Sequence, residues 1–99
     1  EKKLPFFHEL LENGIYAELQ STIPMFTPTA WSSFMTGMNP GAHGVTGFFT
    51  RKSDSYEIVL SNAYSRRGKD IWTILSEHGK KVVMMNVPLT YPPKKVKNS

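Results

Sequence analysis

Residues 27–44 of this 99-residue chain are Thr27-Pro-Thr-Ala-Trp-Ser-Ser-Phe-Met-Thr36-Gly37-Met-Asn-Pro-Gly-Ala-His43-Gly44, and they determine how the rest is interpreted. Thr27 before Pro28 is typical of a helix start, with Thr27 as the N-cap and Pro28 as the first helical residue. Gly37 predicts the end of this helix, which we expect to cover about residues 28–35. A helix N-terminus presents unpaired N–H groups and the positive end of the helix dipole. Thr27 is therefore either an ordinary cap or a hydroxyl placed where a phosphoryl group would bind.

Two further helices are predicted on either side of this segment. The first begins near Leu4, has apolar residues at helical spacing and is closed by Asn13-Gly14 as a C-cap. The second runs over residues 70–78, with Asp70 at its start and Gly79 just past its end. We expect its inner face to carry Ile71, Ile74, Leu75 and His78.

Alternating or continuous apolar residues predict strands between the helices. Residues 15–20 alternate apolar and polar side chains, and a short strand is expected at residues 56–60 after a loop. Residues 81–87 are nearly continuously apolar, which favours an inner parallel strand at residues 82–86 that is buried on both faces. The order of these elements predicts an α/β fold. The side chains expected in its core include Trp31, Phe34, Met84 and Met85.

The composition is that of a globular protein. Hydrophobic residues make up 39% of the chain and charged residues 20%, and no apolar run is long enough to cross a membrane. The absence of cysteine excludes disulfide frameworks and thiolate metal sites and fits a reducing compartment, so a cytoplasmic location is expected. The net charge of +4 comes from dispersed basic pairs, which are typical of solvated ends of elements rather than of a specific nucleic-acid interface. These pairs are Lys2-Lys3, Arg51-Lys52, Arg66-Arg67, Lys80-Lys81 and Lys94-Lys95.

A spaced motif runs through the opening segment: Thr27, then Thr36-Gly37 nine and ten residues later, then Pro40 and His43-Gly44. It resembles the nucleophile region of the alkaline phosphatase superfamily, and within it the type I phosphodiesterase/nucleotide pyrophosphatase group. The resemblance extends over nearly the whole chain, through residues 10–14, 21–24, 67–72 and 86–93. Sulfatases share the spacing but begin at a Cys or Ser that is oxidised to an aldehyde, which the β-methyl group of Thr27 prevents.

The resemblance implies a partial alkaline-phosphatase-like α/β/α sandwich with a mostly parallel sheet. Residues 1–99 would be a single domain, a fragment of a larger phosphodiesterase- or phosphatase-like catalytic domain that acts on a phosphate ester. It also implies that Thr27 is the catalytic nucleophile and that its hydroxyl oxygen is a metal ligand. Two divalent metal ions, expected to be zinc, would activate Thr27 and assist the leaving group. Their Asp and His ligands are expected outside these residues, so the isolated chain should be inactive and should hold no metal tightly.

Ala30 departs from the family pattern. Many phosphodiesterases of this group have an Asn three residues after the nucleophile, which donates to a phosphate oxygen. Ala30 cannot donate, so the nucleotide specificity of the group is not carried over. The family's loop His corresponds to His43 and is not one of its usual metal ligands, so we expect His43 to bond loop backbone. Ser32 and Ser33 have no base nearby in the sequence, Thr36 is expected to cap the helix end, and His8 and His78 are expected to be packing or surface residues.

The sequence leaves two other functions open. One is a non-catalytic basic α/β module that binds nucleic acid or an acidic partner, for which salt-dependent binding to unrelated oligonucleotides would be diagnostic. The other is a hydrolase-like remnant kept for interaction. Exposed sheet edges favour self-association of the isolated chain, whereas specific nucleic-acid and membrane partners are not expected.

Overall fold

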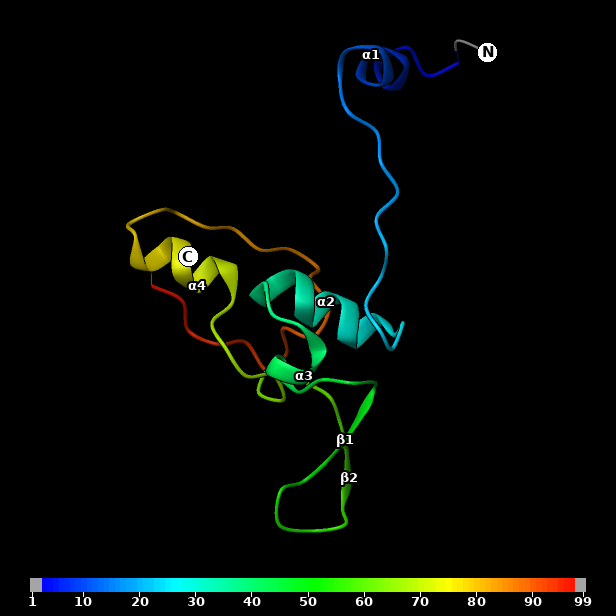
Figure 1. Ribbon diagram of the computed structural model, residues 1–99. Helices are drawn as coiled ribbons and strands as arrows, with labels where there is room; N and C mark the ends of the chain where they lie inside the picture. Colours follow the sequence, from blue (N-terminus) through cyan, green and yellow to red (C-terminus); the bar gives the residue numbers. More distant parts are fainter. Residues whose placement is uncertain (1–2, 98–99) are drawn as a thin grey trace.

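The structure is a computed structural model that describes residues 3–97, and it is a small mixed α/β arrangement (Figure 1). Lys2, in the first basic pair, lies outside the described residues. The elements in chain order are α1 (Pro5–Asn13), α2 (Thr27–Thr36), α3 (Pro40–His43), β1 (Phe49–Arg51), β2 (Ile58–Leu60) and α4 (Ile71–Glu77). The predicted helices are confirmed to within one or two residues, and α3 adds a short turn of helix inside the expected loop.

The sheet in the described part of the chain has two antiparallel strands, so the prediction of a mostly parallel sheet is wrong there. β1 pairs with β2 in the register Phe49↔Leu60 and Arg51↔Ile58. The amide of Lys52 donates to the Glu57 carbonyl at 3.1 Å and closes the hairpin loop. β2 confirms the end of the predicted strand, whereas β1 falls in a stretch expected to be a loop. β1 is a strand because it pairs with β2, and a local sequence pattern does not reveal such a partner.

Two segments predicted as strands are irregular. Residues 15–20 are extended and exposed throughout, and residues 81–87 form no strand. Asn86, at the end of the second segment, has a φ of 53°, which extended pairing does not allow. No backbone–backbone hydrogen bond joins either segment to another part of the described chain. A strand needs a partner for its N–H and C=O groups, and neither segment has one beside it. Self-association through these unpaired segments stays a prediction.

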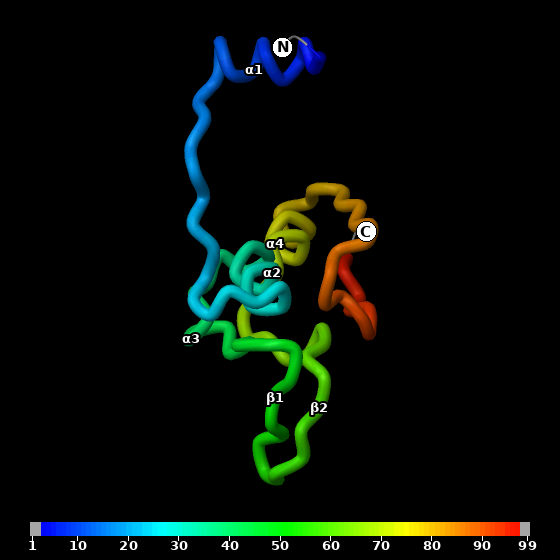
Figure 2. The backbone as a smooth tube through the Cα atoms, turned by 90° about the vertical axis from the view of Figure 1, so that its right-hand side faces the viewer, coloured from blue at the N-terminus to red at the C-terminus, as the bar shows by residue number. Residues whose placement is uncertain are grey.

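α1 stands apart from the rest of the described chain at the far end of residues 15–20 (Figures 1 and 2). Its apolar side chains gather on one side at helical spacing, as predicted, and Gly14 follows as the C-cap. All of them are exposed: Phe6, Phe7, Leu10 and Leu11. The helix pattern is therefore confirmed, while the packing that such a pattern normally serves is missing.

The core lies where three segments distant in sequence meet. The Arg67 amide donates to the His43 carbonyl at 2.9 Å, and the Ala63 amide donates to the Tyr91 carbonyl at 2.9 Å. Met35 of α2 and Val45 after α3 are fully or almost fully buried there. Backbone hydrogen bonds between turns, rather than a sheet, thus connect three segments: the loop after α2, residues 61–70 and residues 87–93.

α4 buries a different face from the one predicted. Ile71, Ile74 and Leu75 are 51%, 41% and 41% exposed, whereas Trp72 and Ser76 are buried. The prediction assumed a sheet against the aliphatic face, and the described chain offers none. Instead α4 packs on the C-terminal segment, where the Ser76 hydroxyl donates to the Lys97 carbonyl. Met85, also predicted in the core, is exposed for the same reason.

Candidate functional site

α2 begins one residue earlier than predicted, at Thr27 itself. Phe26 is the N-cap, with φ −114° and ψ 145°, and its carbonyl accepts the Ala30 amide at 2.9 Å. Thr27 is thus the first helical residue rather than the cap, and Pro28 is the second. The Thr27 side chain is exposed and its hydroxyl makes no hydrogen bond within residues 3–97. The structure therefore leaves this hydroxyl available at the N-terminus of a ten-residue helix.

The solvent-facing side of α2 continues from Thr27 through Ala30, Trp31 and Phe34, which follow at helical spacing. Trp31 and Phe34 were predicted in the core, but they are 36% and 74% exposed and meet edge to face at 5.6 Å between ring centroids. Together with residues 19–22 they line a groove of about 500 Å³. The exposed hydroxyl thus lies at the end of an apolar helix face.

The opposite side of α2 is buried. Pro28, Thr29, Ser32 and Met35 face inward, and the hydroxyls of Thr29 and Ser32 have no hydrogen-bond partner in the part of the chain that the structure describes. At the helix end, the Thr36 hydroxyl donates to the Ser32 carbonyl at 2.7 Å and accepts from the Met38 amide at 3.3 Å. The predicted capping role of Thr36 is therefore confirmed.

His43 is fully buried and joins α3 to α2. The Val45 amide donates to its Nδ1 at 3.1 Å, so the predicted bond to loop backbone is confirmed. Its Nε2 lies 2.9 Å from the Ser33 hydroxyl, a contact that the sequence analysis missed because ten residues separate the two. Burial, and secondarily the charge of Arg66, lower the pKa of His43 below 6.5.

The Ser33–His43 pair is not a nucleophile and its base. A backbone N–H can only donate, so the Nδ1 that accepts from Val45 carries no proton. In the neutral ring the proton is then on Nε2, which donates to the Ser33 oxygen. A general base would need its lone pair at that position. The contact therefore holds two elements together and does not activate the serine.

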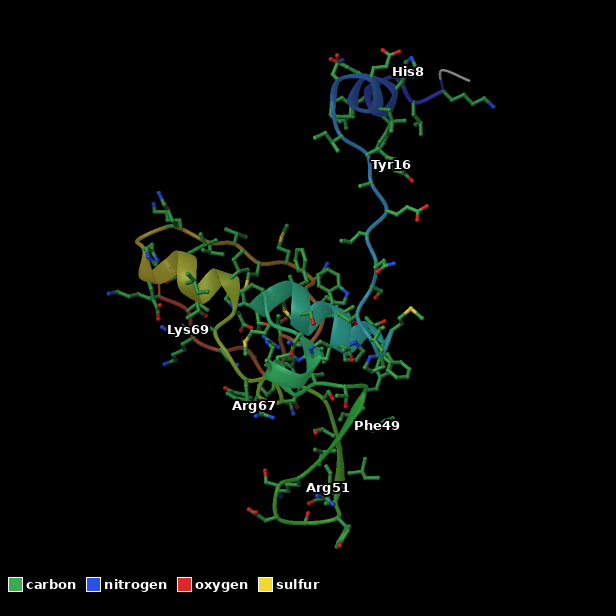
Figure 3. The ribbon with its side chains drawn as sticks, in the orientation of Figure 1. His8, Tyr16, Phe49, Arg51, Arg67 and Lys69 are labelled. Atoms are coloured by element: carbon green, nitrogen blue, oxygen red, sulfur yellow. The ribbon has the colours of Figure 1, made fainter. Side chains whose placement is uncertain are left out.

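The turn after α3 depends on a glycine. Asn39 caps α3 by accepting the Ala42 amide at 2.9 Å, and Gly44 ends it with φ +79°. The guanidinium of Arg67 lies against Gly44, where an added Cβ would be 3.0 Å from Nη2 and 3.2 Å from Nε. Figure 3 shows Arg67 beside α3. Both the backbone angle and the close approach require glycine here.

Gly44→Ala is expected to destabilise the chain more than Gly37→Ala. Both glycines have a left-handed φ, +79° and +67°, so each alanine should cost about 1–2 kcal/mol. Nothing lies within 4 Å of a Cβ at Gly37, whereas at Gly44 the Arg67 guanidinium has to move. Urea unfolding of the two variants measures the difference. Equal losses would show that the contact with Arg67 contributes nothing.

Arg66 was predicted to be a solvated residue at the end of an element, but the structure shows that its side chain is buried. Its Nε and Nη2 donate to the two carboxylate oxygens of Asp70 at 2.5 and 2.9 Å, and Nη1 donates to the Leu89 carbonyl at 2.6 Å. The two side chains are 1% and 3% exposed. Asp70 does occupy the predicted N-cap position of α4, but its carboxylate makes no cap bond. The i, i+4 spacing of opposite charges was the available signal.

The residues present do not fit a complete metal site. Within residues 3–97 there is no group of three or more His, Cys, Asp or Glu side chains that could hold a metal ion. The exposed Thr27 hydroxyl offers one oxygen, and the buried Asp70 carboxylate is committed to Arg66. Catalytic metal sites need several carboxylate or imidazole ligands.

Comparison with known proteins gives one match. The family model described as type I phosphodiesterase / nucleotide pyrophosphatase matches residues 1–99. No curated protein and no solved structure matches significantly. No helix in residues 3–97 has the length and apolar character needed to cross a membrane.

Proposed function

Because the chain belongs to the type I phosphodiesterase/nucleotide pyrophosphatase family, we propose that it is part of a hydrolase that attacks phosphate esters with the hydroxyl of Thr27. The family acts on phosphate esters and is generally metal-dependent. The observation that carries the proposal is the position of Thr27 on the first turn of α2, with an exposed hydroxyl that takes no part in capping. The spaced motif around it supports the same assignment.

The N-terminus of α2 suits an anionic substrate. The first turn of a helix has N–H groups without intrahelical acceptors, and Thr27 and Thr29 contribute them here because Pro28 has none. A phosphoryl group bound at these amides would lie next to the Thr27 oxygen. In the proposed reaction this oxygen forms a bond to phosphorus while the bond to the leaving alcohol or nucleotide breaks. Water then hydrolyses the phosphothreonine.

The Thr27 hydroxyl must be activated as a nucleophile, and the described residues do not supply a complete site for the activating metal ions. A threonine hydroxyl is almost entirely protonated at neutral pH, and a divalent metal ion, when bound, lowers its pKa. Since these residues do not form a complete metal site, we propose that the ligands for two such ions, expected to be zinc, come from other residues of the protein.

The substrate is not narrowed to nucleotides. Ala30 follows Thr27 by one helical turn and has no donor for a phosphate oxygen. Next to it lies the apolar face of Trp31 and Phe34, without a charged side chain among the residues that line its groove. The proposed substrate class is therefore a phosphate ester, as the family implies, with no particular leaving group assigned.

The proposal is tested by assaying hydrolysis of bis(p-nitrophenyl) phosphate and of a phosphomonoester with added zinc or manganese. Residues 1–99 alone are expected to be inactive, and a longer protein that contains them is expected to cleave one of the two compounds until EDTA is added. EDTA-sensitive turnover by residues 1–99 alone would contradict the placement of the metal ligands. Absence of activity in the longer protein would contradict the proposed function.

A further inference from the structure

Both ring nitrogens of His43 are engaged, and they hold two different elements. Nδ1 accepts the amide of Val45, 3.1 Å away in the turn after α3. Nε2 lies 2.9 Å from the hydroxyl of Ser33 on α2. The ring is fully buried, so water cannot replace either partner. The relative placement of α2 and α3 therefore depends on the hydrogen-bonding state of this one imidazole.

Protonation would break this arrangement. An imidazolium is a donor at both nitrogens, so Nδ1–H would face the N–H of Val45, and two donors would stand 3.1 Å apart. The buried Val45 amide would lose its acceptor, which is costly in a site without water. Only the contact with Ser33 would survive.

Among residues 3–97, the elements packed around His43 offer no free acid to stabilise the charged ring. Residues 61–70 carry three cations: the charge of Arg66 acts on His43, the Arg67 backbone amide donates to the His43 carbonyl at 2.9 Å, and Lys69 pairs with Glu77. Asp70, the carboxylate of that segment, is bound on both oxygens by Arg66. α2 contributes the neutral Ser33, and α3 has no titratable side chain besides His43 itself. Desolvation and like charge thus act in the same direction and lower the pKa of His43.

We propose that neutral His43 is a positioning residue for Thr27. Ser33 is six residues after Thr27 on the same helix, so a bond at Ser33 fixes how α2 is turned about its axis. It thereby fixes where the Thr27 hydroxyl points relative to the loop that His43 organises. This inference rests on the proposed role of Thr27 and adds a residue that touches no substrate.

The contribution of His43 to the stability of the folded chain should decrease at acidic pH. Because the pKa of His43 is lower in the folded chain than its ordinary value of 6.5, the unfolded chain binds the proton more tightly. The stabilisation by His43 is therefore complete above pH 6.5, decreases as the pH falls below that value, and is lost once the pH is below the folded pKa.

Nitrogen NMR of the imidazole rings tests the tautomer in this chain without any activity assay. At neutral pH, His43 is expected to show an unprotonated Nδ1 and a protonated Nε2. On acidification, its ring and the amides of Ser33 and Val45 should change with one midpoint, below the ordinary histidine value of 6.5. A protonated Nδ1 at neutral pH, or a midpoint at or above 6.5, would overturn the inference.

Kinetics of an active protein that contains this sequence test the positioning. Ser33→Ala keeps the ring and removes its partner on α2, while His43→Gln removes the titrating group and keeps an amide donor. Each is expected to lower kcat roughly 10- to 100-fold with KM little changed, as for a misplaced reacting group. His43→Gln should also abolish the fall in activity on the acid side. His78→Gln is the matched control and should change neither.

The outcomes separate this inference from the proposed function. If Thr27→Ala keeps activity, the proposed function is wrong and this inference fails with it, whatever the tautomer. If Thr27 is required but Ser33→Ala and His43→Gln keep the wild-type kcat and acid profile, only the positioning role fails. Should His43→Gln not fold, Ser33→Ala and the NMR titration still decide the question.

Discussion

Thr27→Ala is expected to abolish phosphoester hydrolysis in an active protein that carries this sequence. The substitution removes the exposed hydroxyl of the first turn of α2, where the Thr29 hydroxyl is buried, and loss of a covalent nucleophile lowers kcat by roughly 10³-fold or more. The fold should be nearly unaffected. The Thr27 hydroxyl makes no cap bond, so the cost is that of a surface change, within about 0.5 kcal/mol. Steady-state hydrolysis of bis(p-nitrophenyl) phosphate and urea unfolding measure the two effects.

Two variants sharpen this test. Thr27→Ser keeps the oxygen and should retain measurable turnover. Thr46→Ala removes an exposed threonine hydroxyl outside any helix and should leave the rate unchanged. Wild-type turnover by Thr27→Ala would show that another group attacks phosphorus.

Arg66→Ala is expected to cause the largest loss of stability. It would leave the carboxylate of Asp70 buried without its partner and the Leu89 carbonyl without its donor. Removing one member of a buried ion pair typically costs about 3–5 kcal/mol, which is comparable with the whole stability of a small domain. The chain should therefore be largely unfolded, as circular dichroism and urea titration would show.

An exposed pair in the same region is the control. Lys69 and Glu77 pair at 2.7 Å with side chains 62% and 47% exposed, so Lys69→Ala should cost less than about 1 kcal/mol. The double replacement Arg66→Met with Asp70→Leu should be milder than Arg66→Ala, because no charge is left unpaired. Equal losses for Arg66→Ala and Lys69→Ala would refute the importance of the buried pair.

The helices could be predicted because their signals are local. Pro28 and Gly37 mark the two ends of α2, and Asp70 and Gly79 mark those of α4. For α2, the prediction missed only the first turn, since Phe26 rather than Thr27 takes the N-cap position. That choice depends on which carbonyl accepts the first helical amide, and either residue can supply one.

The strands could not be predicted because they depend on partners. Residues 82–86 have the composition of an inner strand, yet nothing in the described chain pairs with them. The same absence exposes Trp31, Phe34 and the aliphatic face of α4, since apolar patterns predict that a face will be buried but not what will cover it.

In the candidate site, the sequence predicted the motif residue Thr27 but not the contacts between side chains that lie apart in the chain. Thr27 follows from a motif with fixed spacing, and its role as nucleophile stays a prediction. The contact between Ser33 and His43 arises from the turn of chain between α2 and α3, which no local pattern encodes. The i, i+4 spacing of Arg66 and Asp70 indicates their pairing, but Arg66 was interpreted as part of the solvated basic pair Arg66-Arg67.

In this chain, a regular helix is expected to open locally more easily than an irregular segment that is tied to the core. α1 has nine residues, too few for an isolated helix to persist in water, and no other element in residues 3–97 packs against it. Residues 86–97 are irregular, yet Leu89, Tyr91 and Lys97 are tied to Arg66, Ala63 and Ser76. The amides of Ala63 and Arg67, which donate to the Tyr91 and His43 carbonyls, are therefore coupled to global unfolding and should exchange with solvent slowly, whereas those of α1 open independently. The cooperative unit of the molecule is defined by three irregular anchors, and one of its most regular helices lies outside it.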